Sequence, residues 1–229
     1  HGDAILIETP QGRQFLIDGG PDAPRLLSLV GQRLPFWDRR LDGLILTSPD
    51  EERLAGLVPL LERYQVDEIA LGPERGAGAH YERWQALLTE RDVTTVAVWQ
   101  RGSTWPLEHN IWLQALWPPE GQKGPLVLKL TYGETSFLLS GAATTVVEQS
   151  LVQQNADDLA SSVLLVPRHG IKTAATPAFL QSVAAEIAVS VFYYFYGTDD
   201  FWALTLALTA IMLPYMVQVC LVAILGGVQ

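Results

Sequence analysis

The sequence predicts an α/β fold in which two β-sheets pack face to face and helices cover their outer surfaces. Short apolar runs of strand length alternate with segments of helical spacing over about the first 190 residues. The composition supports a substantial core, because 48% of the 229 residues are hydrophobic and 17% are charged. Repeated strands with helices inserted between them fit an αβ/βα sandwich.

The strands are predicted where β-branched and apolar residues form runs of four to seven between turn residues. The first two flank a Gln11-Gly12 turn, so we expect a hairpin. The predicted strands are residues 4–7, 14–17, 43–47, 68–71, 93–98, 111–116, 126–132, 136–139, 163–166 and 187–191. Apolar residues spaced three and four apart predict helices at residues 24–32, 55–64, 80–89, 145–153 and 176–183.

The charge of the chain is acidic and uneven. All fifteen Lys and Arg residues and twenty-three of the twenty-five acids lie in the first 186 residues, which gives this part a formal charge of −8. Such a surface repels phosphate backbones on average, because DNA binding needs basic residues that displace counterions. Composition alone therefore gives no support for nucleic-acid binding.

The C-terminal part differs from the rest, and we predict a domain over residues 1–191 and a hydrophobic tail over 192–229. The twenty-nine residues from 201 to 229 carry no charge, and a helix of about 20 apolar residues crosses a bilayer. We therefore expect a transmembrane helix and a membrane location, with a buried or foreign hydrophobic segment as the alternative. Residues 194–218 faintly resemble a helix pair of XK-related membrane proteins, which would make the chain a chimera.

Several segments share their order and spacing with one known family. They are Gly2 to Ile7, Phe15 to Gly20, Leu46 to Leu57, Thr135 to Ala142 and Val163 to Thr173. Over about residues 1–190 the chain resembles the metallo-β-lactamase-like domain of the ComEC family of competence DNA-uptake proteins. The resemblance implies a metallo-β-lactamase-like αβ/βα sandwich. His1 would fall inside the first strand of that family, so we expect the sequence to be part of a longer protein.

The resemblance also locates a degenerate metal site. Active relatives carry His-x-His-x-Asp-His after the strand that ends in Thr, a later Gly-Asp and a His-His-Gly-Ser run. An arginine cannot be a ligand, since it has no free lone pair and stays protonated, and a methyl group has nothing to donate. The residues at the family's site positions here are Ser48, Asp50, Glu52, Arg53, Ala142, Arg168 and His169.

Ordinary structural roles explain most of these residues. Asp50 and Glu52 suit the positive end of a helix dipole, and a lone histidine such as His169 is more often hydrogen-bonded than metal-bound. Asp18, in an Asp-Gly-Gly sequence, suits a tight turn. We therefore expect no catalytic residue, no metal and no small-molecule cofactor. The alternative is an oxygen-seeking metal, Mn or Mg, or else Zn, held by Asp50, Glu52 and His169.

Three functional hypotheses follow. The first is a pseudoenzyme domain with a structural or interaction role in membrane-associated DNA uptake, for which the resemblance implies single-stranded DNA and other competence proteins as partners. The second is an enzyme, a metal-dependent phosphodiesterase or nuclease acting on DNA. The third is a membrane-anchored binding module unrelated to DNA.

Overall fold

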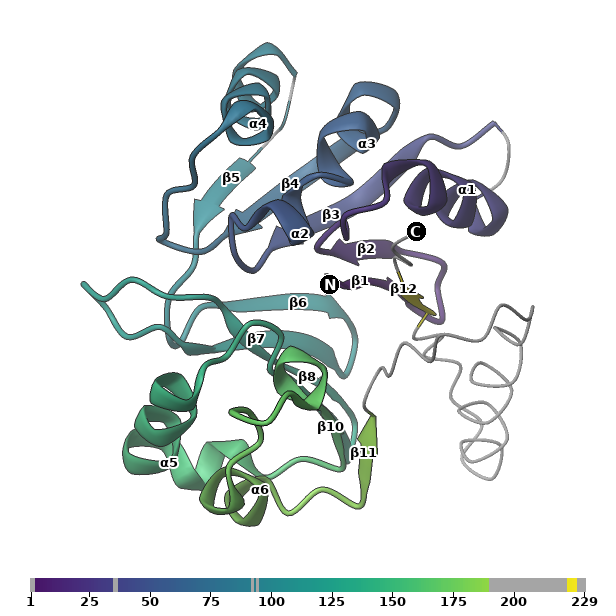
Figure 1. The fold of residues 1–229 in the computed structure, drawn as a ribbon. Helices are drawn as coiled ribbons and strands as arrows, with labels where there is room; N and C mark the ends of the chain where they lie inside the picture. The colour runs from purple at the N-terminus through teal and green to yellow at the C-terminus, as the bar shows by residue number, and fades with distance from the viewer. Residues whose placement is uncertain (1–2, 35–36, 92, 94, 190–221, 226–229) are drawn as a thin grey trace, which may run out of the picture.

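Two six-stranded β-sheets form the centre of the molecule, with helices outside each of them (Figure 1). The computed structural model describes residues 3–34, 37–91, 93, 95–189 and 222–225. Helices α1, α3 and α4 lie outside the first sheet, and α5 and α6 lie outside the second (Figure 1). The α/β sandwich of two sheets expected from the sequence is therefore confirmed.

The first sheet has the order β12-β1-β2-β3-β4-β5. Strand β1 is antiparallel to both of its neighbours, whereas β2, β3, β4 and β5 are parallel to one another. The bounds of these strands are β1 Asp3–Glu8, β2 Gln14–Ile17, β3 Arg40–Leu46, β4 Gln65–Leu71, β5 Thr95–Val98 and β12 Val222–Leu225.

The second sheet has the order β11-β10-β9-β8-β7-β6. Strands β6 to β9 form an antiparallel meander, and β9, β10 and β11 are parallel. The bounds are β6 Thr104–Glu108, β7 Ile111–Trp117, β8 Val127–Tyr132, β9 Thr135–Leu139, β10 Val163–Leu165 and β11 Ile187–Val189.

Two helices begin at residues whose side chains accept a bond from a free backbone N–H group. Asp22 caps the first helix by accepting a bond from the Arg25 N–H, and Thr144 caps the fifth through the Val147 N–H. The bounds are α1 Ala23–Arg33, α2 Glu51–Leu54, α3 Leu57–Arg63, α4 Ala79–Glu90, α5 Thr145–Leu159, the 3₁₀ turn η1 Pro167–Gly170 and α6 Pro177–Val183.

Alternation along the strands divides the core into three layers, because successive side chains point to opposite faces of a sheet. In β2, Phe15 and Ile17 face the second sheet, whereas Leu16 faces the helices. In the second sheet, Leu139 lies between the sheets and Leu138 packs against the helices outside it. Both faces of each sheet are therefore covered.

Most tryptophans in and near the middle strands are buried and pack in the core. Trp99 and Trp105 are buried and make an edge-to-face contact, with ring centroids 5.9 Å apart. Gly43 leaves the room that Trp105 fills, since a Cβ at that glycine would lie 2.3 Å from the indole ring. Trp112 is 39% exposed and is the exception. Packing between the two sheets therefore explains the positions of Trp99 and Trp105.

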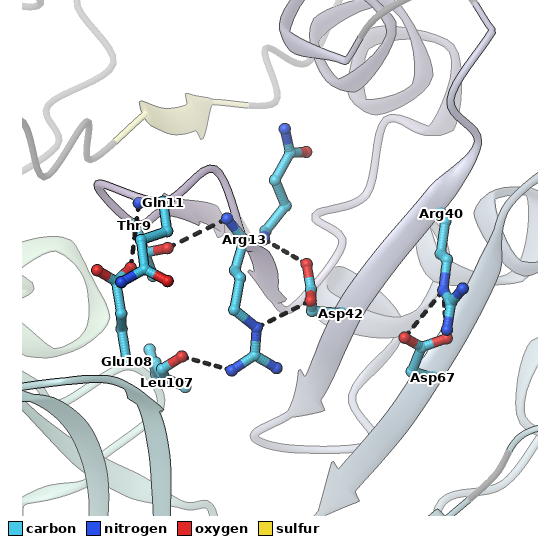
Figure 2. Close-up of polar contacts among 9 residues, drawn as sticks. Thr9, Gln11, Arg13, Arg40, Asp42, Asp67, Leu107 and Glu108 are labelled. Atoms are coloured by element: carbon cyan, nitrogen blue, oxygen red, sulfur yellow. Dashed lines mark hydrogen bonds and ion pairs between the residues drawn. The ribbon is translucent and has the colours of Figure 1, made fainter.

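Polar contacts join the β1–β2 hairpin to the second sheet at its edge strand (Figure 2). Arg13 donates to the Leu107 carbonyl at 2.5 Å and to the Asp42 carboxylate at 2.9 Å. The Gln11 N–H donates to Glu108 at 3.2 Å. The bonds to Leu107 and Glu108 of β6 connect the two sheets at this end, whereas the bond to Asp42 of β3 lies within the first sheet.

The observed elements differ from the expected ones in several places. The structure adds α2, β6 and η1, and α3 covers residues 57–63 of the helix expected at 55–64. Helix α5 continues to Leu159, six residues beyond the expected end.

The predicted tail helix at 201–229 is mostly outside the described residues. The 191/192 domain boundary and the whole XK-like segment at 194–218 also lie outside them. Within the predicted span only Val222–Leu225 is described, and these residues are not helical, so the predicted transmembrane helix is not shown. These four residues form β12, whose backbone pairs with β1. Across the described ranges, no helix combines the length and apolar character needed to cross a bilayer.

Candidate functional site

The candidate site lies where loops leave the carboxyl ends of strands in both sheets, which is where α/β sheets commonly place functional residues. Asp18 follows β2 and Thr47 follows β3, and the Asp18 N–H donates to the Ile45 carbonyl at 2.8 Å. From the second sheet, Gly141 follows β9, and its position would place a Cβ 3.8 Å from the Thr47 hydroxyl. The two sheets thus bring their loops together.

Asp18 is the buried acceptor at the centre of this region. One carboxylate oxygen accepts from the Thr47 N–H at 2.7 Å, and the other accepts from the Thr47 hydroxyl at 2.5 Å. Its backbone has a positive φ of 57°, in keeping with the tight turn expected from Asp-Gly-Gly. The turn explains the backbone of Asp18, but its side chain has a further role that the sequence analysis did not identify.

The partner of that carboxylate is Arg53, which is only 6% exposed. Its Nε lies 3.5 Å from Oδ2 of Asp18, and its Nη1 lies 3.4 Å from Oδ2 of Asp50. A buried charge needs such compensation, because leaving water costs several kcal/mol per ion. The resemblance to the ComEC family implies that Arg53 stands at the position of the last histidine of the metal motif.

The backbone around Arg53 is locked to the loop after β2. The Gly19 N–H donates to the Arg53 carbonyl at 2.8 Å, and the Gly56 N–H donates to Gly20 at 2.9 Å. A Cβ on Gly56 would lie 2.1 Å from the Gly19 carbonyl oxygen and 3.0 Å from that of Gly20, so only glycine permits this approach. Short α2 therefore presents Arg53 to Asp18 with little freedom.

Burial controls the protonation of Asp18. Loss of solvent raises the pKa of Asp18 to about 6, although the charge of Arg53 and the two bonds from Thr47 act in the opposite direction. Asp3 shows the same balance, since burial raises its pKa while His169 and Arg53 oppose the change. Both carboxylates are therefore costly to keep charged in this interior.

Ser48 and Asp50, at the first two motif positions, bond to each other. The buried Ser48 hydroxyl lies 2.9 Å from Oδ2 of Asp50 and 3.4 Å from Oε2 of Glu74. The same Asp50 oxygen is the one that approaches Arg53. One oxygen of Asp50 is thus already engaged by protein groups, although its side chain is 59% exposed.

His169 joins the second sheet to β1. Its Nδ1 lies 3.7 Å from Oδ1 of Asp3, and both side chains are largely buried. Glu52 is close enough for its charge to act on Asp3, as do His169 and Arg53. The charged groups close enough to influence one another here are therefore those of Asp3, Glu52, Arg53 and His169.

Arg168 and His169 have an unusual backbone. Their φ values are 47° and 56°, a left-handed conformation that is uncommon for residues other than glycine. The Arg168 N–H donates to the Gly141 carbonyl at 2.9 Å, which ties η1 to the loop that carries Ala142. The Arg168 side chain is exposed, so it is separate from the buried Asp18–Arg53 pair.

These residues do not fit a metal centre of the kind that the family resemblance implies. The Arg53 guanidinium lies among the carboxylates and offers no lone pair, and its charge repels a cation. Ala142 supplies no donor atom. Among the residues that the structure describes, no group of three or more His, Cys, Asp and Glu side chains is arranged to hold a metal ion.

The structure brings together Ser48, Asp50, Glu52, Arg53 and His169, whereas Arg168 and Ala142 contribute backbone near them. Sequence reasoning missed the roles of Asp3 and Glu74, and the side-chain role of Asp18. Asp3 and Asp18 could have been found, since each lies in a segment that resembles the family. Glu74 had no such signal, because it lies in a loop that reads as a flexible connection.

Solved structures with the same architecture identify the fold. The MIM-2 metallo-β-lactamase superposes with a TM-score of 0.53 at 16% identity, over 79% of this chain and 79% of that one. The fold is that of the metallo-β-lactamases. The Rm3 metallo-β-lactamase gives a TM-score of 0.50 at 15% identity, over 79% of this chain and 83% of that one. A HARLDQ-motif metallo-β-lactamase of Cronobacter sakazakii gives 0.50 at 14% identity, over 79% and 78%.

At such low identity these structures show the metallo-β-lactamase fold and nothing about activity. No protein-family profile matches the chain. Among curated proteins, "Competence protein ComA" of Neisseria gonorrhoeae is 26% identical over 197 residues. The match covers 82% of this chain but a quarter of the length of that protein.

Proposed function

We propose that this metallo-β-lactamase-fold domain is a pseudoenzyme that has a structural or binding role in membrane-associated DNA uptake. The observation that carries the proposal is the buried ion pair between Arg53 and Asp18, 3.5 Å apart, at a position where active relatives bind metal. A fixed guanidinium supplies the positive charge that the carboxylates need. It cannot activate water as a bound metal ion does.

The link to DNA uptake rests on similarity. The 26% identity to a competence protein extends over most of this chain, and it agrees with the segments that resemble the ComEC family. Because this chain spans only a quarter of that protein, the domain would act as one part of a larger assembly. A membrane location and contacts with competence proteins and single-stranded DNA belong to the same proposal.

A metal-dependent nuclease is the second candidate, and one observation favours it. Asp50 and Glu52 are both exposed at the mouth of the site, where carboxylate oxygens could reach a hard cation. His169 lies close enough for its charge to act on Glu52. The nuclease alternative requires a metal ion to bind beside Arg53, whose positive charge repels it.

The experiment is a nuclease assay of the 229-residue chain on single- and double-stranded DNA, with Mn²⁺, Mg²⁺ or Zn²⁺ in separate reactions. We expect no cleavage above the level of the Asp50→Ala chain in any of them. Cleavage that Asp50→Ala and Glu52→Ala abolish, while Glu120→Ala leaves it intact, would establish the nuclease instead.

DNA binding without cleavage separates the proposal from a membrane-anchored module unrelated to DNA. Fluorescence anisotropy with a labelled single strand should show binding that weakens steeply with salt, because released counterions drive such association. An absence of binding at low salt would contradict a direct DNA contact and leave a role through protein partners. Competence proteins would then be tested by co-purification.

A further inference from the structure

A small pocket lies at the end of the first sheet opposite to the candidate site. It has a volume of about 280 Å³ and is lined by Leu27, Arg39, Arg63 and Tyr64. Arg39 immediately precedes β3, and Tyr64 immediately precedes β4, so both belong to the amino ends of these parallel strands. Thr47 and Asp18 lie at the carboxyl ends, which makes the two regions distinct.

The backbone fixes the two sides of the pocket relative to each other. Arg40 and Gln65 are paired across the β3–β4 ladder, so the residues before them, Arg39 and Tyr64, are neighbours. The Gln65 N–H donates to the Arg39 carbonyl at 2.8 Å and extends the ladder to that point. On the third side, the Tyr64 hydroxyl lies against Gly31 of α1.

The guanidinium groups of Arg39 and Arg63 have no carboxylate partner among the described residues, although acids are close in sequence. Both oxygens of Asp67 accept from Nε of Arg40, at 2.7 and 2.9 Å (Figure 2). Glu62 pairs with Arg83 at 3.1 Å, and Asp38 accepts from the Arg40 N–H at 3.1 Å. The neighbouring acids are thus engaged elsewhere.

We propose that this pocket binds the phosphate group of a small phosphorylated ligand. Two guanidinium groups offer charge-assisted hydrogen bonds suited to a phosphate dianion, and the Tyr64 hydroxyl can add another. Leu27 and the Tyr64 ring form an apolar wall for the organic group that carries the phosphate. The proposal does not rest on the function proposed above.

A small ligand fits better than a polymer or a membrane. The pocket is just below the volume range typical of ligand sites, so it accommodates one phosphate and a modest organic group. The first 186 residues carry a formal charge of −8, which opposes the many simultaneous contacts that a polyanion or an anionic bilayer needs.

Isothermal titration calorimetry of the 229-residue chain tests the proposal, with inorganic phosphate, thymidine 5′-monophosphate and unphosphorylated thymidine as probes. We expect phosphate and the monophosphate to bind and thymidine not to bind. Arg39→Gln and Arg63→Gln should each weaken binding about tenfold, the loss of one charge-assisted contact. Arg101→Gln, an exposed arginine in the turn before β6, should leave binding unchanged.

Three outcomes would overturn the proposal. One is no heat of binding for either phosphorylated probe at millimolar concentration. Another is binding that survives Arg39→Gln with Arg63→Gln in a chain whose circular dichroism is unchanged. The third is much tighter binding of a phosphorylated oligonucleotide or of anionic vesicles, lost in the same double variant. If Arg63 only complements the C-terminal dipole of α3, its substitution will lower stability and leave binding intact.

Discussion

Arg53 compensates the charge of the buried Asp18 carboxylate inside the protein. Its guanidinium is as buried as the Asp18 carboxylate it faces, with side-chain exposures of 7% and 8%. Thr47 completes the shell around Asp18 through its N–H and its hydroxyl. A buried pair of this kind contributes little net stability when intact, yet removing one partner is expensive because the other charge stays buried.

Replacing Arg53 by methionine should therefore destabilise the fold at neutral pH. Asp18 would keep its bonds to Thr47 but lose its counter-charge, and the expected decrease in the free energy of unfolding is about 3–5 kcal/mol. Urea denaturation at pH 7.5, followed by circular dichroism, measures it.

Two companion variants show whether the loss comes from the stranded charge. Adding Asp18→Asn to Arg53→Met should recover much of the stability, since no uncompensated charge remains. Arg40→Met, which removes an exposed pair with Asp67, should have a much smaller effect. Equal losses in the Arg53 and Arg40 variants, or no recovery in the double variant, would contradict the assignment.

The raised pKa of Asp18 predicts a pH dependence. The folded value is about 6, against a usual 3.8, so between these values the native state binds more protons than the unfolded state. The contribution of Asp18 to stability is therefore present below about pH 4 and is lost as the pH rises through 6.

Asp18→Asn removes this titration. The difference in unfolding free energy between the parent chain and Asp18→Asn should shift by about 1–3 kcal/mol against the parent from pH 4 to pH 6.5, given about 1.4 kcal/mol per pKa unit. Urea denaturation across this range supplies the values. A constant difference would show that Asp18 has an ordinary pKa, and a difference of opposite sign would show that its pKa is lowered in the folded state.

At the scale of elements, α5 holds the loop that follows η1. Glu148 is fully buried and accepts from the Ala175 and Thr176 N–H groups at 2.8 and 2.7 Å. The Thr145 hydroxyl donates to the Thr173 carbonyl of the same loop. These contacts hold the loop next to the left-handed residues of η1. A strained backbone persists only when the surrounding structure holds it in this way.

Glu148→Gln should loosen this loop while leaving the sheets intact. A glutamine has a single acceptor oxygen, so one buried N–H loses its partner, at a cost of about 1–3 kcal/mol. Hydrogen exchange should accelerate at residues 173–176 and stay unchanged in β8 and β9. Glu134→Gln, in the exposed β8–β9 turn, is the control. Unchanged exchange at Ala175 would show that Glu148 does not hold the loop.

The sequence predicts most elements because, in those segments, the spacing of apolar residues agrees with the positions of turn residues. The expected hairpin matches β1 and β2 within a residue at each end. Strand β6 was missed because Pro106 breaks its run, and proline is tolerated only on an edge strand such as this one. Strand β12 depends on pairing with β1 across more than 200 residues, which no local pattern encodes.

Over the whole molecule, backbone hydrogen bonds connect the loops that form the site. The Leu126 N–H donates to the Thr47 carbonyl at 2.7 Å, and the Arg168 N–H donates to Gly141 at 2.9 Å. The candidate site residues could be located in the sequence, because they follow predicted strands. The Arg53–Asp18 pair could not, since it joins a residue of α2 to the loop after β2 and depends on the close approach of Gly56 to that loop.

The most direct test of this account is the metal content of the chain, measured by inductively coupled plasma mass spectrometry. The 229-residue chain would be expressed in medium supplemented with zinc and manganese, purified without chelators and compared with Asp50→Ala. The account predicts far less than one metal ion per chain, with no difference between the two proteins. One or two ions per chain, lost in Asp50→Ala, would contradict it.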